Sequence, residues 1–107
     1  MEHARIKVIV KEPGEPYGHV EVIQNDLRTF QHCVGGPIEV IERDGVAIVC
    51  HEEGKLLGLA GNFRCPGDVI AGTAVMCGVE GEWMTDVPVS MDEWKALLDK
   101  WGRGGMT

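Results

Sequence analysis

The chain has 107 residues, a length typical of one domain that buries a single hydrophobic core. Hydrophobic residues make up 44% of it and charged residues 25%, as in ordinary globular proteins, which excludes disorder over the whole length. Its net charge of -7 argues against non-specific nucleic-acid binding and against docking on an anionic membrane surface.

The sequence shows no targeting or membrane-spanning segment. A span needs about 20 apolar residues, whereas the apolar run near the N-terminus is short and flanked by charges. We therefore expect a cytosolic location, where the cysteines at positions 33, 50, 65 and 77 stay reduced. No two of them have C-x-x-C spacing, so we expect free thiols, no metal and no cofactor.

Two adjacent His/Cys pairs, His32-Cys33 and Cys50-His51, are candidates for a metal site. Folding would have to bring the two pairs together. Neighbouring side chains point about 100° apart in a helix and to opposite faces of a strand, so each pair readily offers only one ligand. We expect buried or half-buried thiols at these positions instead.

The first segments predict an antiparallel hairpin. RIKVIVK (residues 5–11) alternates, with Ile6, Val8 and Val10 on one face, which is typical of a half-buried strand. HVEVI (residues 19–23) alternates in the same way. The Pro- and Gly-rich EPGEPYG between them predicts a turn.

The next segment predicts a short helix. Asn25 or Asp26 is suited to cap its start, and Leu27, Phe30 and Val34 recur at helical spacing. The Gly-Gly-Pro sequence that follows ends the helix. We expect its apolar side to lie on a sheet.

A second hairpin follows. IEVIER (residues 38–43) and VAIVCH (residues 46–51) flank Asp44-Gly45, a strong signal for a two-residue turn. The second of these strands is apolar at five consecutive positions, so we expect it in the middle of the sheet, covered on both faces.

The glycine-rich stretch EEGKLLGLAGNFRCPGD (residues 52–68) lies between two apolar stretches. Turns are predicted at EEGK and at CPGD, and the part between them favours an irregular loop or a short bent strand. A further strand is predicted over about residues 73–79.

The C-terminal segment predicts an amphipathic helix over about residues 90–101. Ser90 and Glu93 match a capping box. Met91, Trp94, Leu98 and Trp101, widened by Leu97, form an apolar stripe at helical spacing that favours a core-facing side. Residues 102–107 are expected to be a frayed tail.

These elements predict a single α+β domain over residues 1–107. Its mostly antiparallel sheet has about five strands, with a short helix after the second strand and an amphipathic helix at the C-terminus. The predicted order is ββαββ(loop)βα.

The glycine-rich stretch is also the best candidate for a binding site. Its glycines allow close backbone approach, Arg64 is suited to clamp a phosphate or carboxylate, and Asn62 is suited to hydrogen-bond an amide or base edge. Gly61 and Lys55 complete the candidate set. The alternative is purely structural: the glycines serve turns, and Arg64 pairs with Glu52 or Glu53 on the surface.

Several features of this region occur together in a known family. A Gly-Gly pair precedes Ile-Glu-Val, the turn EEGKLLGL is followed by Asn62 and Arg64, and a D-V-I-A-G-T run covers residues 68–73. Over about residues 5–80 the chain resembles the DUF3846 domain family. The resemblance implies an uncharacterised small cytosolic protein of bacteria, phages or plasmids. It brings no known activity, and the mobile-element setting favours an anti-defence or regulatory accessory role by association only.

No catalytic sequence motif occurs in the chain, so we expect a non-enzymatic protein and assign no catalytic residue. The first hypothesis is an interaction module that presents its sheet edge, or the helix bearing Trp94 and Trp101, to a partner protein. The second is a binder or sponge for a nucleotide-like anion, built on residues 58–68. A third is a DNA mimic, although the acidic residues are scattered. A homo-oligomer is compatible with the first two, because a small sheet leaves edges to cover.

Overall fold

The computed structural model describes residues 4–104. The strands in this part of the chain are β1 (Arg5–Lys11), β2 (His19–Gln24), β3 (Ile38–Arg43), β4 (Val46–His51), β5 (Gly61–Cys65), β6 (Asp68–Ala71), β7 (Ala74–Glu80) and β8 (Trp83–Thr85). The helices are α1 (Leu27–Val34) and α2 (Met91–Gly104). Neither of these two helices has the length and apolar character needed to cross a membrane.

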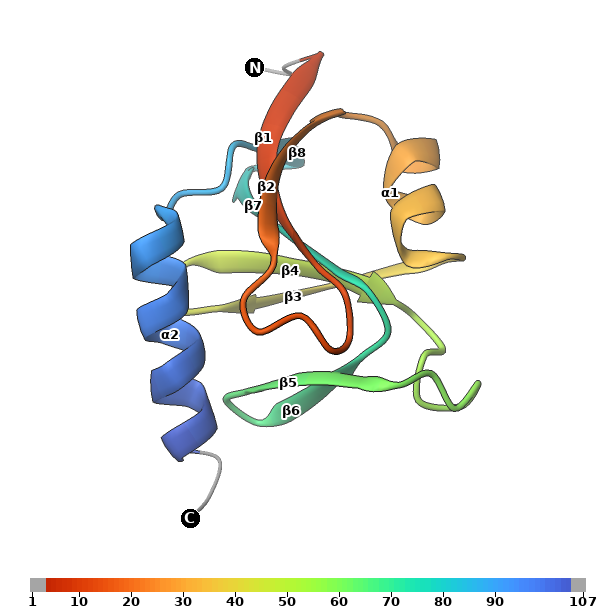
Figure 1. Cartoon of the computed structure of the whole chain (residues 1–107). Helices are drawn as coiled ribbons and strands as arrows, with labels where there is room; N and C mark the ends of the chain where they lie inside the picture. The colour runs from red at the N-terminus through yellow and green to blue at the C-terminus, as the bar shows by residue number, and fades with distance from the viewer. Residues whose placement is uncertain (1–3, 105–107) are drawn as a thin grey trace.

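An antiparallel main sheet separates the two helices. Its strand order is β2-β1-β7-β4-β3, and β8 extends it by pairing with β7. The hairpin of β5 and β6 forms a separate two-stranded sheet. In Figure 1, α1 lies on one side of the main sheet, and α2 lies on the other side, where it contacts β5. The predicted α+β fold is therefore confirmed, with β5, β6 and β8 as strands beyond the predicted set.

Hydrophobic clusters lie on both faces of the main sheet, because alternate residues of its central strands point to opposite sides. The cluster under α1 contains Phe30 and Val34. The cluster under α2 and the β5–β6 hairpin contains Trp94, Trp101 and Ile70. Strand β4 is buried at all six of its positions and lies between β7 and β3, which confirms a strand covered on both faces inside the sheet, although β7 and not β4 is the middle strand.

Strand β1 is more deeply buried than its sequence pattern predicts. Ile6, Val8 and Val10 point toward α1, as expected. Ile9 and Lys11, on the other face, are also buried, so the prediction of a half-exposed strand is wrong for this end. The reason is tertiary, because β7 pairs with residues 9–11.

Local signals place the first helix and the second hairpin. The Asp26 carboxylate accepts a hydrogen bond from the Thr29 N–H at 2.7 Å and caps α1. Asp44 and Gly45 both have positive φ angles, 50° and 79°, as a two-residue hairpin turn of type I′ requires. Leu27, predicted on the buried side of α1, is instead 58% exposed, because it begins the helix beyond the edge of the cluster.

The capping box of α2 forms in both directions. The Ser90 N–H donates to Glu93 Oε1 at 2.8 Å, and the Glu93 N–H donates to Ser90 Oγ at 3.1 Å. The helix runs to Gly104, three residues beyond the predicted end. Two indole N–H groups attach it to the rest of the fold: Trp94 donates to the Tyr17 carbonyl and Trp101 to the Asp44 carboxylate.

Removing the cap is expected to weaken the fold without changing it. Ser90→Ala leaves the Glu93 N–H without its side-chain acceptor, and we expect the free energy of unfolding to fall by about 1 kcal/mol in urea denaturation. The control is Lys100→Ala, an exposed substitution on the same helix, expected to change it by less than about 0.5 kcal/mol. Equal effects of both substitutions would contradict the capping role.

Candidate functional site

The glycine-rich stretch folds into two parts. Residues 52–58 form a turn, and β5 and β6 then form a hairpin around Pro66-Gly67. The predicted irregular loop or bent strand is thus a regular hairpin, with a bulge between Gly61 and Phe63. The signal was present in the CPGD turn, but β5 lacks the apolar alternation that identifies a strand.

The side-chain amide of Asn62 forms hydrogen bonds within the protein. Its Oδ1 accepts from Lys11 Nζ at 2.6 Å, and its Nδ2 donates to the carbonyls of Lys11 and Gly72, both at 2.8 Å. Lys11 is only 3% exposed, and this burial lowers its pKa. The nearby charge of Glu15 acts in the opposite direction and has the smaller effect. Asn62 therefore joins the hairpin to β1 and holds the buried ammonium group.

The other residues of the predicted anion site are only partly assembled. Lys55 forms an ion pair with Asp68, which raises the pKa of Lys55 and lowers that of Asp68. Arg64 lines two open hollows, one with Lys55 and the other with Asn62. Gly61 lines neither of these hollows. Arg64 is therefore near Lys55 in one hollow and near Asn62 in the other. The charge of Lys55 is already paired with that of Asp68.

The two tryptophans of α2 belong to the core. Trp94 is 0% and Trp101 is 4% exposed, because both pack around Phe63, with ring centroids 5.6 and 6.3 Å from the phenyl ring. The apolar stripe of α2 is therefore the core-facing side. The expectation that these rings anchor a partner is corrected, since neither ring is accessible in this fold.

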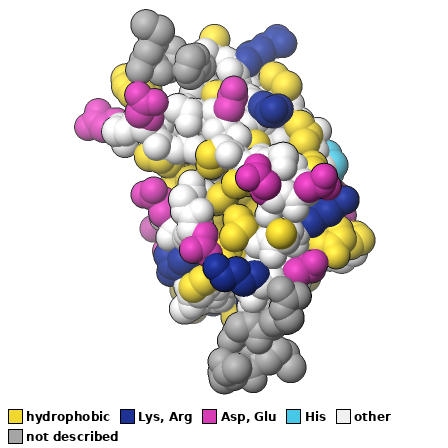
Figure 2. Space-filling view, turned by 90° about the vertical axis from the view of Figure 1, so that its left-hand side faces the viewer, with side chains coloured by type: hydrophobic (Ala, Val, Ile, Leu, Met, Phe, Trp, Pro, Cys, Tyr) yellow, Lys and Arg dark blue, Asp and Glu magenta, His cyan; other side chains and the backbone are white. Residues whose placement is uncertain are grey.

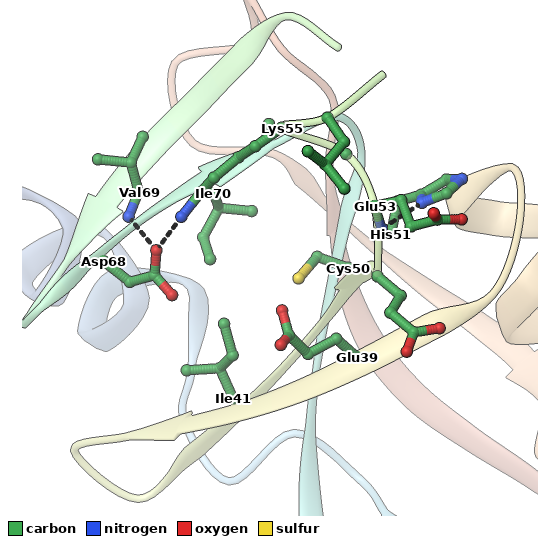
Figure 3. Close-up of a pocket in the computed structure, with 13 residues that line it drawn as sticks. Glu39, Ile41, Cys50, His51, Glu53, Lys55, Asp68, Val69 and Ile70 are labelled. Atoms are coloured by element: carbon green, nitrogen blue, oxygen red, sulfur yellow. Dashed lines mark hydrogen bonds and ion pairs between the residues drawn. The ribbon is translucent and has the colours of Figure 1, made fainter. Parts of the chain in front are cut away.

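A cleft of about 390 Å³ opens between the end of the main sheet and the β5–β6 hairpin (Figure 3). Strands β3 and β4 form one side, the turn over residues 52–58 another, and β6 the third. Glu39 and Cys50 are opposite each other in the β3–β4 ladder and both point into the cleft. Ile41 and Ile70 supply apolar walls.

The cleft is acidic. Its lining residues include four acidic ones, Glu39, Glu52, Glu53 and Asp68, and one lysine, Lys55, which pairs with Asp68. In Figure 3 the Glu39 carboxylate points into the cleft, whereas that of Glu53 lies beside the His51 ring and points away from the cleft. An excess of carboxylates beside apolar walls suits a cationic group carried on an apolar stem. The sequence hypothesis of an anionic ligand therefore does not fit this cleft.

Cys50 and His51 do not form a nucleophile pair. His51 points away from the cleft, and its Nδ1 accepts a hydrogen bond from the Glu53 N–H at 2.9 Å (Figure 3). Gly36 lies directly against the His51 ring, where a Cβ atom would overlap Nε2. Burial, with a smaller contribution from Glu39, raises the pKa of Cys50 to about 11, so this thiol stays protonated near neutral pH.

The cysteines of the described residues are all free thiols. Burial raises the pKa of Cys77 to about 12 and also raises the pKa values of Cys33 and Cys65. Within residues 4–104, no three His, Cys, Asp or Glu side chains are grouped closely enough to hold a metal ion. The two His/Cys pairs of the sequence are therefore not joined into such a group.

Two leucines project beside the cleft. Leu56 is 85% and Leu57 is 60% exposed, at consecutive positions of the turn that extends away from α2 in Figure 1. Leu56 lines the cleft. Leu59, by contrast, lies close to Gly54 and Gly72 and is half-buried, so the turn holds one leucine inside and exposes two.

Acidic side chains on the face that carries α2 are scattered among basic, apolar and neutral ones (Figure 2). A duplex mimic needs a regular track of negative charge in place of the phosphates. This face shows no such continuous track.

The comparisons with known proteins identify the family. The geometry defines a small α+β domain with an acidic cleft at one end of its sheet. The model of DUF3846, a domain of unknown function, matches residues 6–99, and the chain belongs to this family. The match extends past the predicted residues 5–80 and includes most of α2. No curated protein and no solved structure matches the chain.

Truncating Asn62 is expected to destabilise the fold. Asn62→Ala removes the side-chain acceptor of the buried Lys11 ammonium group and the donor to two carbonyl groups, so we expect a loss of about 2–4 kcal/mol in unfolding free energy. Urea denaturation measures this loss. Gln24→Ala, an exposed amide truncation on β2, is the control. A loss below about 1 kcal/mol would show that the network contributes little.

Lys11 is expected to make stability depend on pH in the alkaline range. Because burial lowers its pKa below the ordinary 10.5, the folded chain releases this proton before the unfolded chain does. The unfolding free energy of the wild type should therefore rise relative to that of Lys11→Met as the pH approaches 10.5. Lys100→Met, exposed on α2, is the control. A difference between wild type and Lys11→Met that is constant with pH would contradict the lowered pKa.

Proposed function

We propose that this protein is a small, non-enzymatic accessory protein that acts by binding a partner protein through the cleft and the two leucines beside it. The observation that carries the proposal is the exposure of Leu56 and Leu57, at 85% and 60%. Adjacent leucines held out of the core at the mouth of a cleft form an apolar anchor point for a partner.

The chemistry of the cleft defines the partner segment. Apolar walls contributed by Ile41 and Ile70 lie beside the Glu39 carboxylate, and the exposed Glu52 and Glu53 add negative charge next to the cleft. A partner segment with an apolar side chain next to a lysine or arginine matches both features. The carboxylates then steer and orient the segment, and the apolar contacts supply most of the affinity.

The biological setting is also part of this proposal. The DUF3846 resemblance supports a protein of a phage, plasmid or bacterial mobile element that acts in the cytosol, in an anti-defence or regulatory role. The four free thiols, three of them buried, agree with a reducing compartment. An anionic ligand has less support, since Lys55 is paired with Asp68 and the Asn62 amide is used internally.

Replacing the exposed leucines is expected to weaken partner binding strongly while leaving the fold intact. For Leu56→Ser/Leu57→Ser we expect at least about a tenfold loss of the partner in affinity capture from source-cell extract, quantified by mass spectrometry. The melting temperature should stay close to that of the wild type, because both side chains are exposed. Glu52→Gln/Glu53→Gln should weaken the same complex and reduce its sensitivity to salt.

The matched control is Leu27→Ser, which removes a leucine of similar exposure, 58%, from α1. It should capture the partner as well as the wild type does. If the leucine double variant captures the same proteins in the same amounts as the wild type, this surface is not the binding site.

A further inference from the structure

Strand β2 is an open edge of the main sheet. All six of its residues pair with β1 on one side, and β2 is the last strand in the order β2-β1-β7-β4-β3. The backbone groups on its other side have no strand to pair with among the described residues. Such an edge is a template for adding another strand.

The side chains of β2 divide by face. Val20 and Val22 point to the α2 side of the sheet and are 46% and 64% exposed. His19 and Glu21 point to the other side, where Glu21 Oε2 lies 2.5 Å from His19 Nε2. Glu15 contacts the other ring nitrogen of His19 at 3.1 Å. The edge therefore presents two exposed valines on one face and the charged pair His19 and Glu21 on the other.

We propose that two copies of this chain pair through β2, as antiparallel strands related by a two-fold axis at Val20. The axis places Val20 against Val20 of the second copy. It places His19 opposite Glu21 of the second copy, and Glu21 opposite His19, so two pairs of complementary charge form on one face. Residues 19–21 of the two chains then pair directly and join the two main sheets at their edges, while residues 22–24 of each β2 lie opposite residues 18–16 of the other chain.

Charge selects this register over its neighbours. Residues directly opposite in an antiparallel pair share a face, so a two-fold axis perpendicular to the sheet must pass beside a residue. An axis at Glu21 would place two Glu21 carboxylates against each other. An axis at Val22 would pair more of the strand, but it would place Glu21 opposite Ile23 and His19 opposite residue 25, so neither charge would meet an opposite charge. Only the axis at Val20 brings opposite charges together.

The histidine is suited to carry the positive charge. Hydrogen bonds with Glu21 and Glu15 raise the pKa of His19. Burial lowers it by a smaller amount. Lys11, whose charge also acts on Glu15, is held by Asn62. His19 is therefore the cation that the dimer presents to Glu21 of the second copy.

The edge strand β3 is less suited to this pairing. Its one strongly exposed apolar side chain is Val40, at 39%, whereas β2 has two. A self-complementary edge also favours a second copy over an unrelated strand, because a two-fold contact closes and does not propagate into a fibre.

A charge-swap experiment tests both the dimer and its register. Sedimentation equilibrium of the wild-type chain should give twice the mass of one chain, 11.7 kDa. His19→Glu and Glu21→Lys should each weaken the dimer by about 30-fold, because each turns two attractive cross-strand pairs into repulsive ones. An equimolar mixture of the two variants should restore association. In the mixed dimer, the glutamate introduced at position 19 of one chain faces the lysine introduced at position 21 of the other, and the unchanged Glu21 faces the unchanged His19.

His32→Glu on α1 and Glu82→Lys in the turn after β7 make the same charge changes at exposed positions away from β2 and serve as controls. They should dimerise as the wild type does. A wild type that stays monomeric at high micromolar concentration overturns the proposal. If the β2 substitutions leave dimerisation unchanged, or if the two variants do not associate when mixed, the contact lies elsewhere or in another register. Either result also overturns the proposal.

Discussion

The contact between Asn62 and Lys11 is the constraint on which the outer layer of this protein depends. A lysine that is 3% exposed needs acceptors, and the Asn62 side chain supplies one while donating to two backbone carbonyls. This contact fixes the β5–β6 hairpin over the end of β1. The neighbouring Phe63 is thereby turned into the space between Trp94 and Trp101, so the hairpin and α2 share one hydrophobic cluster.

The same arrangement explains why the cleft exists. Strand β5 contacts α2, and β6 lies next to it on the side away from the helix. Beyond β6 no further element covers the α2-side face of β3 and β4 among the described residues, so Glu39 and Cys50 face an open space. Trp94 and Trp101 are buried in this layer and are not accessible to a partner. The surface that we propose for binding is instead the turn with the exposed Leu56 and Leu57.

The two proposed surfaces lie at different ends of the main sheet. The cleft is next to β3 at one end of the strand order, and the dimer edge β2 is at the other. Pairing through β2 leaves both clefts open. A dimer would then present two equivalent clefts, and a partner with two binding segments would gain affinity through the second contact without any new interaction.

Local chemistry in the sequence determined the elements whose signals are short-range. The Asp26 cap, the Asp44-Gly45 turn and the Ser90/Glu93 box each act within a few residues, and each forms in the structure. The turn also implies the register that sets Glu39 opposite Cys50. Tertiary structure alone decided the rest. The burial of Lys11 and the inward turn of Asn62 depend on contacts between residues 51 positions apart, and the cleft brings together residues of β3, β4 and β6, so no local pattern encodes them.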